Sequence, residues 1–229
     1  MGVSEGQEVL VVNGCALPRR ALYDLENESW YMEEGDIMTV GVLPTTQTKW
    51  GKVTSVRPKP PGTVVEEGRS IAFVEAKKFV GHVNARFRAE VVDANRELLE
   101  VPHLCQSDPY NRGWIAKLRP LEAGYRERLR TFGEVAEALS EEIRSRGIVC
   151  FKEVPDVVMA ALGVECSQAL LVLADAIRQV PPGQVIHLVA EADENAEREV
   201  RAWSRITGNE LLEFVLEGRL AHALIRRRG

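Results

Sequence analysis

The sequence changes its pattern at Pro120, from short β-rich runs to longer helical periods. Before it, short runs rich in β-branched and apolar residues alternate with turn formers such as Asn13-Gly14 and Pro60-Pro61-Gly62. The runs cover residues 9–12, 36–42, 52–56 and 70–75. Strands at this spacing are typical of an antiparallel sandwich or barrel. No long helical period precedes residue 120, so we expect a mainly β first half.

After Pro120, apolar residues fall at steps of three or four with charged residues between them. They are Leu129, Phe132, Val135, Leu139 and Ile143. This period predicts an amphipathic helix that ends near Gly147. We expect this helix to pack back on the first domain or to bridge to a second one.

The last part of the chain alternates between strand and helix patterns. Strands are predicted at 157–162 and 184–190, helices at 167–180 and 193–206, and a final hairpin at 211–216 and 220–225. The order β-α-β-α-β-β predicts a small α+β two-layer sandwich with both helices on one face of the sheet. The predicted domains are therefore 1–122, a helix and linker at 123–152, and 153–229.

The composition is that of a globular protein, with 45% hydrophobic and 28% charged residues among 229. The net charge of −5 argues against a nucleic-acid partner. No apolar run is long enough for a membrane helix, and the N-terminus does not resemble a signal peptide, so we expect a cytoplasmic protein. In that reducing compartment Cys15, Cys105, Cys150 and Cys166 are expected to be thiols, and no metal site is predicted.

Two β-rich arms flank the segment Ala76-Lys77-Lys78. Ordinary solvated turn lysines are one interpretation of this segment. The other is that one lysine carries a covalent arm, because a free amine on a long flexible stem is suited to that task.

The wider context resembles the glycine-cleavage H protein, a lipoyl carrier of hybrid-barrel fold, over about residues 20–145. Its motifs here are Tyr23–Trp30 (as an opening strand), Thr39–Val42, Lys59–Gly68, Val74–Lys78, Ala89–Asn95 and Ser107–Leu118. The resemblance implies a lipoyl-type hybrid barrel-sandwich domain carrying covalent lipoic acid, with a lipoyl-attaching ligase as a partner.

In this family the lipoyl lysine follows a glutamate by three residues, which implies Lys78 rather than Lys77. Glu75 would then be the acid that the ligase recognises. The chain departs from the family pattern at Ala76-Lys77 and at Phe79–Val83, and it adds the segments Asn13–Pro18 and Gly147–Phe151. These departures resemble the H-like lipoate-binding proteins associated with bacterial sulfur oxidation.

Cys166 follows a predicted strand and opens a predicted helix. Unpaired backbone N–H groups and the helix dipole would favour its thiolate, so we expect its pKa to fall below the free value of about 8.5. A small buried apolar residue is the competing interpretation.

Residues 156–229 resemble the TusA/SirA-like sulfur-carrier family. The cysteine motif of that family appears as Leu162–Ala169, with Ser167 and Ala169 in place of its two prolines. The resemblance implies that Cys166 carries a persulfide. Cys15, Cys105 and Cys150 have no such motif, and we expect them to be structural.

Three functions remain open at this point. The leading one is a non-catalytic carrier with lipoyl-Lys78 and persulfide-Cys166, serving heterodisulfide-reductase-like or sulfurtransferase proteins. The second is a glycine-cleavage shuttle that carries an aminomethyl group among its decarboxylase, its aminomethyltransferase and dihydrolipoamide dehydrogenase. The third is an unmodified docking module. The chain shows no catalytic triad, paired-carboxylate site or nucleotide-binding loop of its own.

Overall fold

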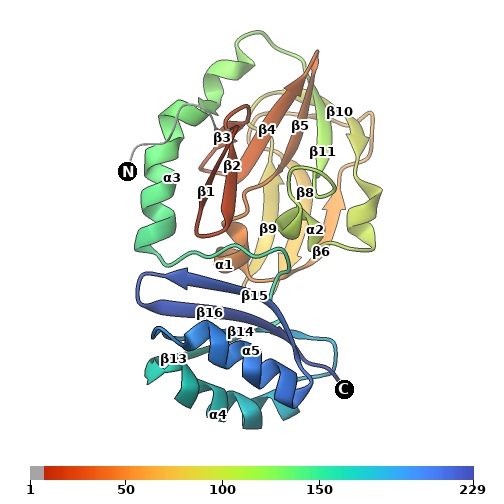
Figure 1. Ribbon diagram of the computed structural model, residues 1–229. Helices are drawn as coiled ribbons and strands as arrows, with labels where there is room; N and C mark the ends of the chain where they lie inside the picture. The colour runs from red at the N-terminus through yellow and green to blue at the C-terminus, as the bar shows by residue number, and fades with distance from the viewer. Residues whose placement is uncertain (1–7) are drawn as a thin grey trace. The chain divides into compact units, whose positions relative to one another are not determined.

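The computed structural model describes residues 8–229 (Figure 1). The chain divides into two compact units, one ending at Lys152 and the other spanning Glu153–Gly229. Each unit has an apolar core of its own. Within the described residues, no helix combines the length and apolar character needed to cross a membrane.

The first unit is built from antiparallel strands, as its sequence pattern predicts. Its three sheets are a hairpin β1-β2, a seven-stranded sheet of order β12-β3-β4-β5-β11-β10-β7, and a three-stranded sheet of order β6-β8-β9. The strands are β1 (Val9–Val12), β2 (Cys15–Pro18), β3 (Leu22–Asp24), β4 (Ser29–Glu34), β5 (Ile37–Val42), β6 (Val53–Pro58), β7 (Val64–Val65), β8 (Ser70–Ala76), β9 (Phe79–Asn84), β10 (Ala89–Ala94), β11 (Ala116–Pro120) and β12 (Arg130–Thr131).

A single apolar cluster joins the two larger sheets. Val40 and Leu118 of the seven-stranded sheet share it with Val56, Val74 and Val83 of the three-stranded sheet, and all five are at most 1% exposed. Burial of such side chains stabilises the fold by about 1.5–3 kcal/mol each. The sheet that holds the lysine hairpin is therefore anchored through its inward-facing residues.

Two features of this unit differ from the sequence expectation. The segment interpreted as one opening strand is a hairpin, because β3 and β4 pair across a turn in which Glu28 has φ 52°. Short helices are also present, namely α1 (Thr46–Trp50), α2 (Leu104–Ser107) and the 3-10 helices η1 (Arg96–Leu99) and η2 (Tyr125–Arg128). Helices of four or five residues are too short to produce a recognisable period.

The amphipathic helix predicted after Pro120 is α3 (Phe132–Ser145). Its first turn is closed by a capping box, in which the Glu134 carboxylate accepts a hydrogen bond from the Thr131 backbone N–H at 2.7 Å. The apolar face of α3 packs on a second cluster that contains Leu17, Tyr23 and Trp30. Of the two placements expected from the sequence, the structure has the helix packed on the first domain.

The second unit has the predicted order β-α-β-α-β-β and a mixed sheet of order β13-β14-β16-β15. β13 and β14 are parallel, and the other pairs are antiparallel. Residues of α4 and α5 share one apolar core with alternate residues of β14 and β16, which places both helices on one face of the sheet (Figure 1). The elements are β13 (Val157–Glu165), α4 (Cys166–Ala176), η3 (Ile177–Gln179), β14 (Val185–Glu191), α5 (Ala196–Thr207), β15 (Glu210–Glu217) and β16 (Leu220–Arg226).

Candidate carrier sites

Lys77 and Lys78 form the two-residue turn that joins β8 to β9, because Ala76 pairs with Phe79. Both lysines are exposed, as the sequence pattern predicts for a hairpin tip. Neither has a positive φ, whereas two-residue hairpin turns usually need one. Contacts from outside the hairpin must therefore hold this turn.

The segment Trp50-Gly51-Lys52 supplies those contacts. The backbone N–H of Lys77 donates to the carbonyl of Lys52 at 3.1 Å, and that of Lys78 donates to the carbonyl of Trp50 at 2.8 Å. Gly51 has φ 67°, and a Cβ there would lie 3.3 Å from Cβ of Lys77. A glycine at the end of α1 thus leaves room for the stems of both lysines.

An aromatic stack lies beside the tip. The rings of Trp50 and Phe79 are parallel within 7°, with their centroids 4.3 Å apart. Phe79 in turn covers Gly81, where a Cβ would lie only 2.5 Å from the Phe79 ring. The departure from the family pattern after the lysine therefore has a structural role, since Gly81 makes space for the ring that fixes Trp50.

Glu75 lies on β8, two residues before the turn, and its side chain is 39% exposed. Its carboxylate pairs with the Arg57 guanidinium on the neighbouring strand at 3.1 Å, and its backbone carbonyl accepts a hydrogen bond from the Thr54 hydroxyl. Glu75 and Lys78 are thus brought together on one hairpin. The Lys78 side chain forms no hydrogen bond or ion pair with the residues that the structure describes.

Cys166 lies at the first position of α4, where the sequence analysis predicts a helix to begin. It belongs to the second unit, and its side chain is 1% exposed. Ala169, Leu170 and Leu173 of its own helix share its apolar core.

The predicted lowering of the Cys166 pKa is wrong. Burial, and after it the negative charges of Glu199 and Asp193, raise the pKa of this thiol from 9.0 to about 11. Desolvation and like charge therefore outweigh the helix dipole. The two carboxylates that act on the thiol come from α5 and from the loop before it, which lie outside the local sequence pattern around Cys166.

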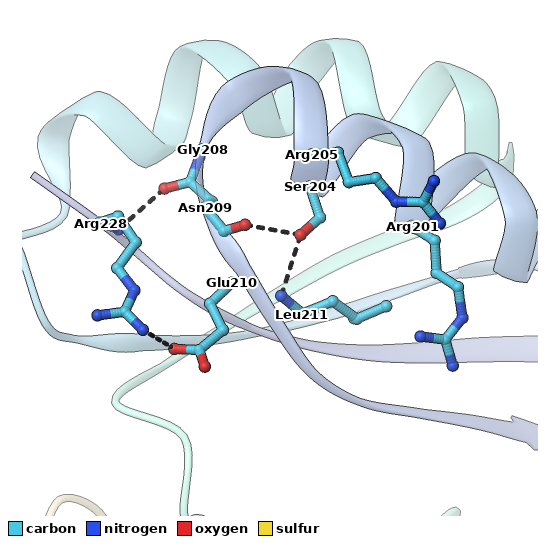
Figure 2. Close-up of a pocket in the computed structure, with 8 residues that line it drawn as sticks. All are labelled: Arg201, Ser204, Arg205, Gly208, Asn209, Glu210, Leu211 and Arg228. Carbon is cyan, nitrogen blue, oxygen red and sulfur yellow. Dashed lines mark hydrogen bonds and ion pairs between the residues drawn. The ribbon is translucent and has the colours of Figure 1, made fainter.

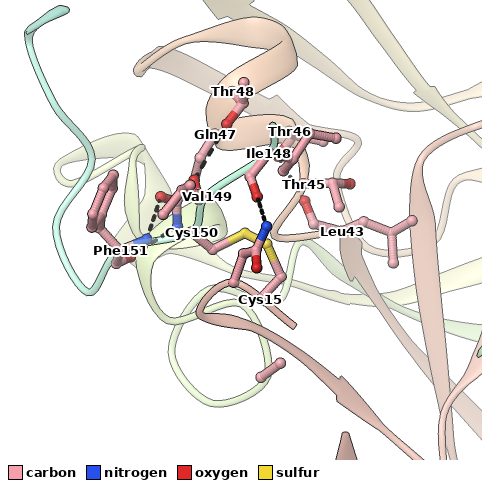
Figure 3. The surroundings of a disulfide bond; sticks show 12 residues. Cys15, Leu43, Thr45, Thr46, Gln47, Thr48, Ile148, Val149, Cys150 and Phe151 are labelled. Carbon is pink, nitrogen blue, oxygen red and sulfur yellow. Dashed lines mark hydrogen bonds between the residues drawn. A yellow bond between two sulfur atoms is a disulfide. The ribbon is translucent and has the colours of Figure 1, made fainter. Parts of the chain in front are cut away.

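The expectation of free thiols is wrong for Cys15 and Cys150, which form a disulfide (Figure 3). Their separation of 135 residues left no spacing motif to reveal the pair. Cys105 is buried as a free thiol, and burial raises its pKa. That environment fits the structural role expected for Cys105.

The disulfide joins the two segments that the sequence analysis singled out as additions. Cys15 follows the Asn13-Gly14 turn, and a Cβ at Gly14 would lie 2.2 Å from the carbonyl oxygen of Cys150. The amide of Asn13 donates to the carbonyl of Ile148 at 3.2 Å. The Gln47 side chain both donates to and accepts from the backbone of Phe151, at 2.9 and 3.0 Å. We call residues 13–15 and 148–151 the disulfide clasp.

Comparison with known proteins assigns a family to most of the first unit. The model described as "Glycine cleavage H-protein" matches residues 21–142, which include Glu75 and Lys78. The second unit and Cys166 lie outside the matched residues.

Individual relatives agree with this match. The chain is 38% identical over 150 residues to glycine cleavage system H protein 2 of Aquifex aeolicus, covering 64% of this chain and 92% of that protein. It is 36% identical over 145 residues to the probable glycine cleavage system H protein 2 of Sulfolobus acidocaldarius, covering 62% and 97%. A crystal structure of a glycine cleavage system H protein from Mycobacterium marinum has a TM-score of 0.48 at 25% identity, covering 54% of this chain and 98% of that chain.

Proposed function

The chain belongs to the glycine cleavage H-protein family through residues 21–142, and from that premise we propose that Lys78 carries a lipoyl group in this protein. H-protein family members carry a lipoyl-lysine, and they generally interact with a lipoyl ligase and with lipoamide dehydrogenase. The observation that supports Lys78 is its place on an exposed two-residue turn, three residues after Glu75.

The residues around Lys78 suit such an attachment. The side chain is exposed, and two backbone hydrogen bonds to the Trp50–Lys52 segment fix the backbone of the turn that carries it. An enzyme can therefore approach the amine without unfolding the hairpin. When attached, lipoate supplies a disulfide–dithiol pair at the end of a long flexible arm.

Glu75 is proposed to mark the target lysine for the attaching enzyme. Arg57 neutralises the charge of this carboxylate only in part. Their ion pair at 3.1 Å is exposed to water and contributes at most about 1 kcal/mol. A partner can displace Arg57 at little cost. Lys77 is exposed on the same turn, so recognition must depend on the offset from Glu75.

We propose further that Cys166 accepts sulfur from a persulfide donor. In this transfer the Cys166 thiolate attacks the outer sulfur of the donor persulfide. A new S–S bond forms on Cys166, the S–S bond of the donor breaks, and the donor leaves as a thiolate. This step needs an exposed and ionised sulfur. The thiol is buried, and its raised pKa, to which burial and then Glu199 and Asp193 contribute, favours the protonated form.

Two features support access to that sulfur. The pairing of β13 with β14 is interrupted between Ala161 and Glu165, and Leu162 within this stretch is 65% exposed. This irregular stretch precedes Cys166 and can open at lower cost than a regular ladder. A donor that presents a cation to Asp193 and Glu199 would also lower the pKa of the thiol.

The proposed function is thus a carrier in sulfur transfer, with heterodisulfide-reductase-like or sulfurtransferase proteins as partners. The support for sulfur over glycine cleavage is the second unit, because aminomethyl transfer has no evident use for a buried cysteine on a separate domain. A glycine-cleavage shuttle and an unmodified docking module are the competing functions.

Intact mass separates these functions. The chain is incubated with lipoyl ligase, lipoate and ATP, and then with a persulfide donor, and each modified peptide is mapped. We expect a lipoyl increment that Lys78→Arg abolishes and Lys77→Arg retains, and a sulfur increment that Cys166→Ser abolishes. Lipoylation without sulfur uptake would favour the glycine-cleavage shuttle, and neither modification would leave the docking module.

A further inference from the structure

The outer face of α5 carries a row of arginines. Arg198, Arg201 and Arg205 follow one another at steps of three and four residues, which places them on one side of the helix. The opposite side, with Ala196, Val200 and Ser204, is buried in the core of the second unit. The arginine row therefore faces away from the sheet on which α5 packs.

Two adjoining hollows of about 400 Å³ each lie along this row, and both are lined by Arg201 and Arg205. The first extends past the end of the helix to Arg228, as Figure 2 shows. Its floor is held by the buried Ser204 hydroxyl, which donates to the carbonyl of Asn209 at 2.6 Å and accepts from the N–H of Leu211 at 3.1 Å. The groove is thus a fixed part of the fold.

Some of the charges on this face are already neutralised. Arg201 pairs with Glu197 at 2.6 Å, and Arg228 pairs with Glu210 at 2.6 Å. Arg198 and Arg205 form no ion pair with residues 8–229, and one carboxylate, Glu194, lies at the far end of the row. The uncompensated positive charge is therefore concentrated at Arg198 and Arg205.

The spacing of these two arginines along α5 matches that of side chains on a peptide. They stand seven residues apart, which is roughly 10 Å along the helix axis. Carboxylates on an extended or helical peptide have this spacing, so one acidic segment can engage both arginines. Ile206, next to Arg205, is 85% exposed and adds an apolar contact at the same end of the row.

We propose that this face of α5 docks an acidic segment of a partner protein, with carboxylates on Arg198 and Arg205 and an apolar side chain on Ile206. All eight basic residues of 153–229 are arginines, and arginine binds carboxylates through two parallel hydrogen bonds. The same 77 residues carry a net charge of 8 − 12 = −4, so this local basic face stands out from its unit. The proposal is independent of any modification at Lys78 or Cys166.

The test uses the full chain and a synthetic 14-residue peptide that has glutamates and a central leucine. Binding is followed by calorimetry at low salt, with inorganic phosphate and a single-stranded oligonucleotide as competing probes. We expect saturable peptide binding that weakens at least tenfold in the double variant Arg198→Glu/Arg205→Glu and about threefold in Ile206→Ser. Phosphate and the oligonucleotide should bind at least tenfold more weakly than the peptide.

The matched control is Arg178→Glu/Arg219→Glu, which makes the same change in net charge at two exposed arginines outside the groove. It should bind the peptide within twofold of the original chain. Thermal melting of every variant shows that the fold is retained. Absence of peptide binding, equal weakening by the control variant, or tighter binding of phosphate or the oligonucleotide would overturn the proposal.

Discussion

The two candidate carrier residues occupy opposite environments. Lys78 projects from an exposed turn whose backbone is fixed by hydrogen bonds to Trp50 and Lys52, whereas Cys166 is 1% exposed in the core of its unit. The amine is ready for a modifying enzyme as the structure stands. The thiol has to be uncovered and separated from two carboxylates first. In a carrier that combines the two, the lysine would therefore be accessible at all times, whereas the cysteine would react only after a conformational change exposes it.

The first prediction compares how much the disulfide contributes to the stability of each unit. Cys15→Ser/Cys150→Ser should lower the stability of the first unit by about 2–5 kcal/mol, because the disulfide closes a long loop. The second unit has no disulfide among its residues, so its melting should not change. Differential scanning calorimetry with and without reductant checks this, and an equal loss in both units would contradict it.

The second prediction compares reactivity. A thiol with a pKa of about 11 is ionised to roughly one part in a thousand at pH 8, so Cys166 should alkylate about two hundredfold more slowly than a free cysteine. Lys78 should acylate at the rate of an exposed lysine. Peptide mapping after timed labelling measures both rates. Alkylation of Cys166 within tenfold of the free rate would remove the contrast between the sites.

The third prediction is that the stability of the second unit falls at high pH. The folded pKa of Cys166 lies above its ordinary value, so the folded state favours the protonated thiol. The contribution of this preference to the free energy of unfolding is fully present below pH 9. It falls by up to about 2 kcal/mol as the pH rises from 9 through 11. Urea unfolding of the second unit at several pH values should show the loss, and Cys166→Ala should remove most of it.

The fourth prediction concerns the carboxylates that oppose the thiolate. Asp193→Asn/Glu199→Gln should lower the pKa of Cys166 and raise its alkylation rate about tenfold at pH 8, because two like charges are removed. Glu194→Gln/Glu197→Gln removes the same charge at two exposed positions, one just before α5 and one in its first turn, and serves as the control. An equal effect of both pairs would show that only net charge matters.

The smallest effect is expected at Glu75. Glu75→Ala should slow lipoylation of Lys78 several-fold while changing the stability by less than about 0.5 kcal/mol, because its pair with Arg57 is exposed. Arg57→Ala breaks the same ion pair and should leave the lipoylation rate near normal. A large loss of stability in Glu75→Ala would show that the residue supports the hairpin instead.

Local patterns predicted β1, β5, β6 and β8 of the first unit and the β-α-β-α-β-β order of the second, because turn formers and apolar periods are properties of neighbouring residues. What they missed depends on residues distant in sequence. The disulfide joins Cys15 to Cys150, and the Cys166 pKa is raised by burial in a core built from several elements and by charges 27 and 33 residues away, at Asp193 and Glu199. The support of the lysine turn by Trp50 and Gly51 is of the same kind, although a glycine directly after a short helix is a visible sign of a special backbone position.

The disulfide clasp also has a mechanical consequence. It converts residues 15–150 into a covalent ring that contains the β8-β9 hairpin and Lys78. Tension applied through the two chain ends would pass from Cys15 directly to Cys150 and would leave the ring unloaded. A single cut anywhere inside the ring would likewise leave its fragments joined until a reductant opened the bond. A bond formed far from the lysine hairpin in sequence thus keeps it off the path of an applied force and keeps it attached to the chain after a nick elsewhere in the ring.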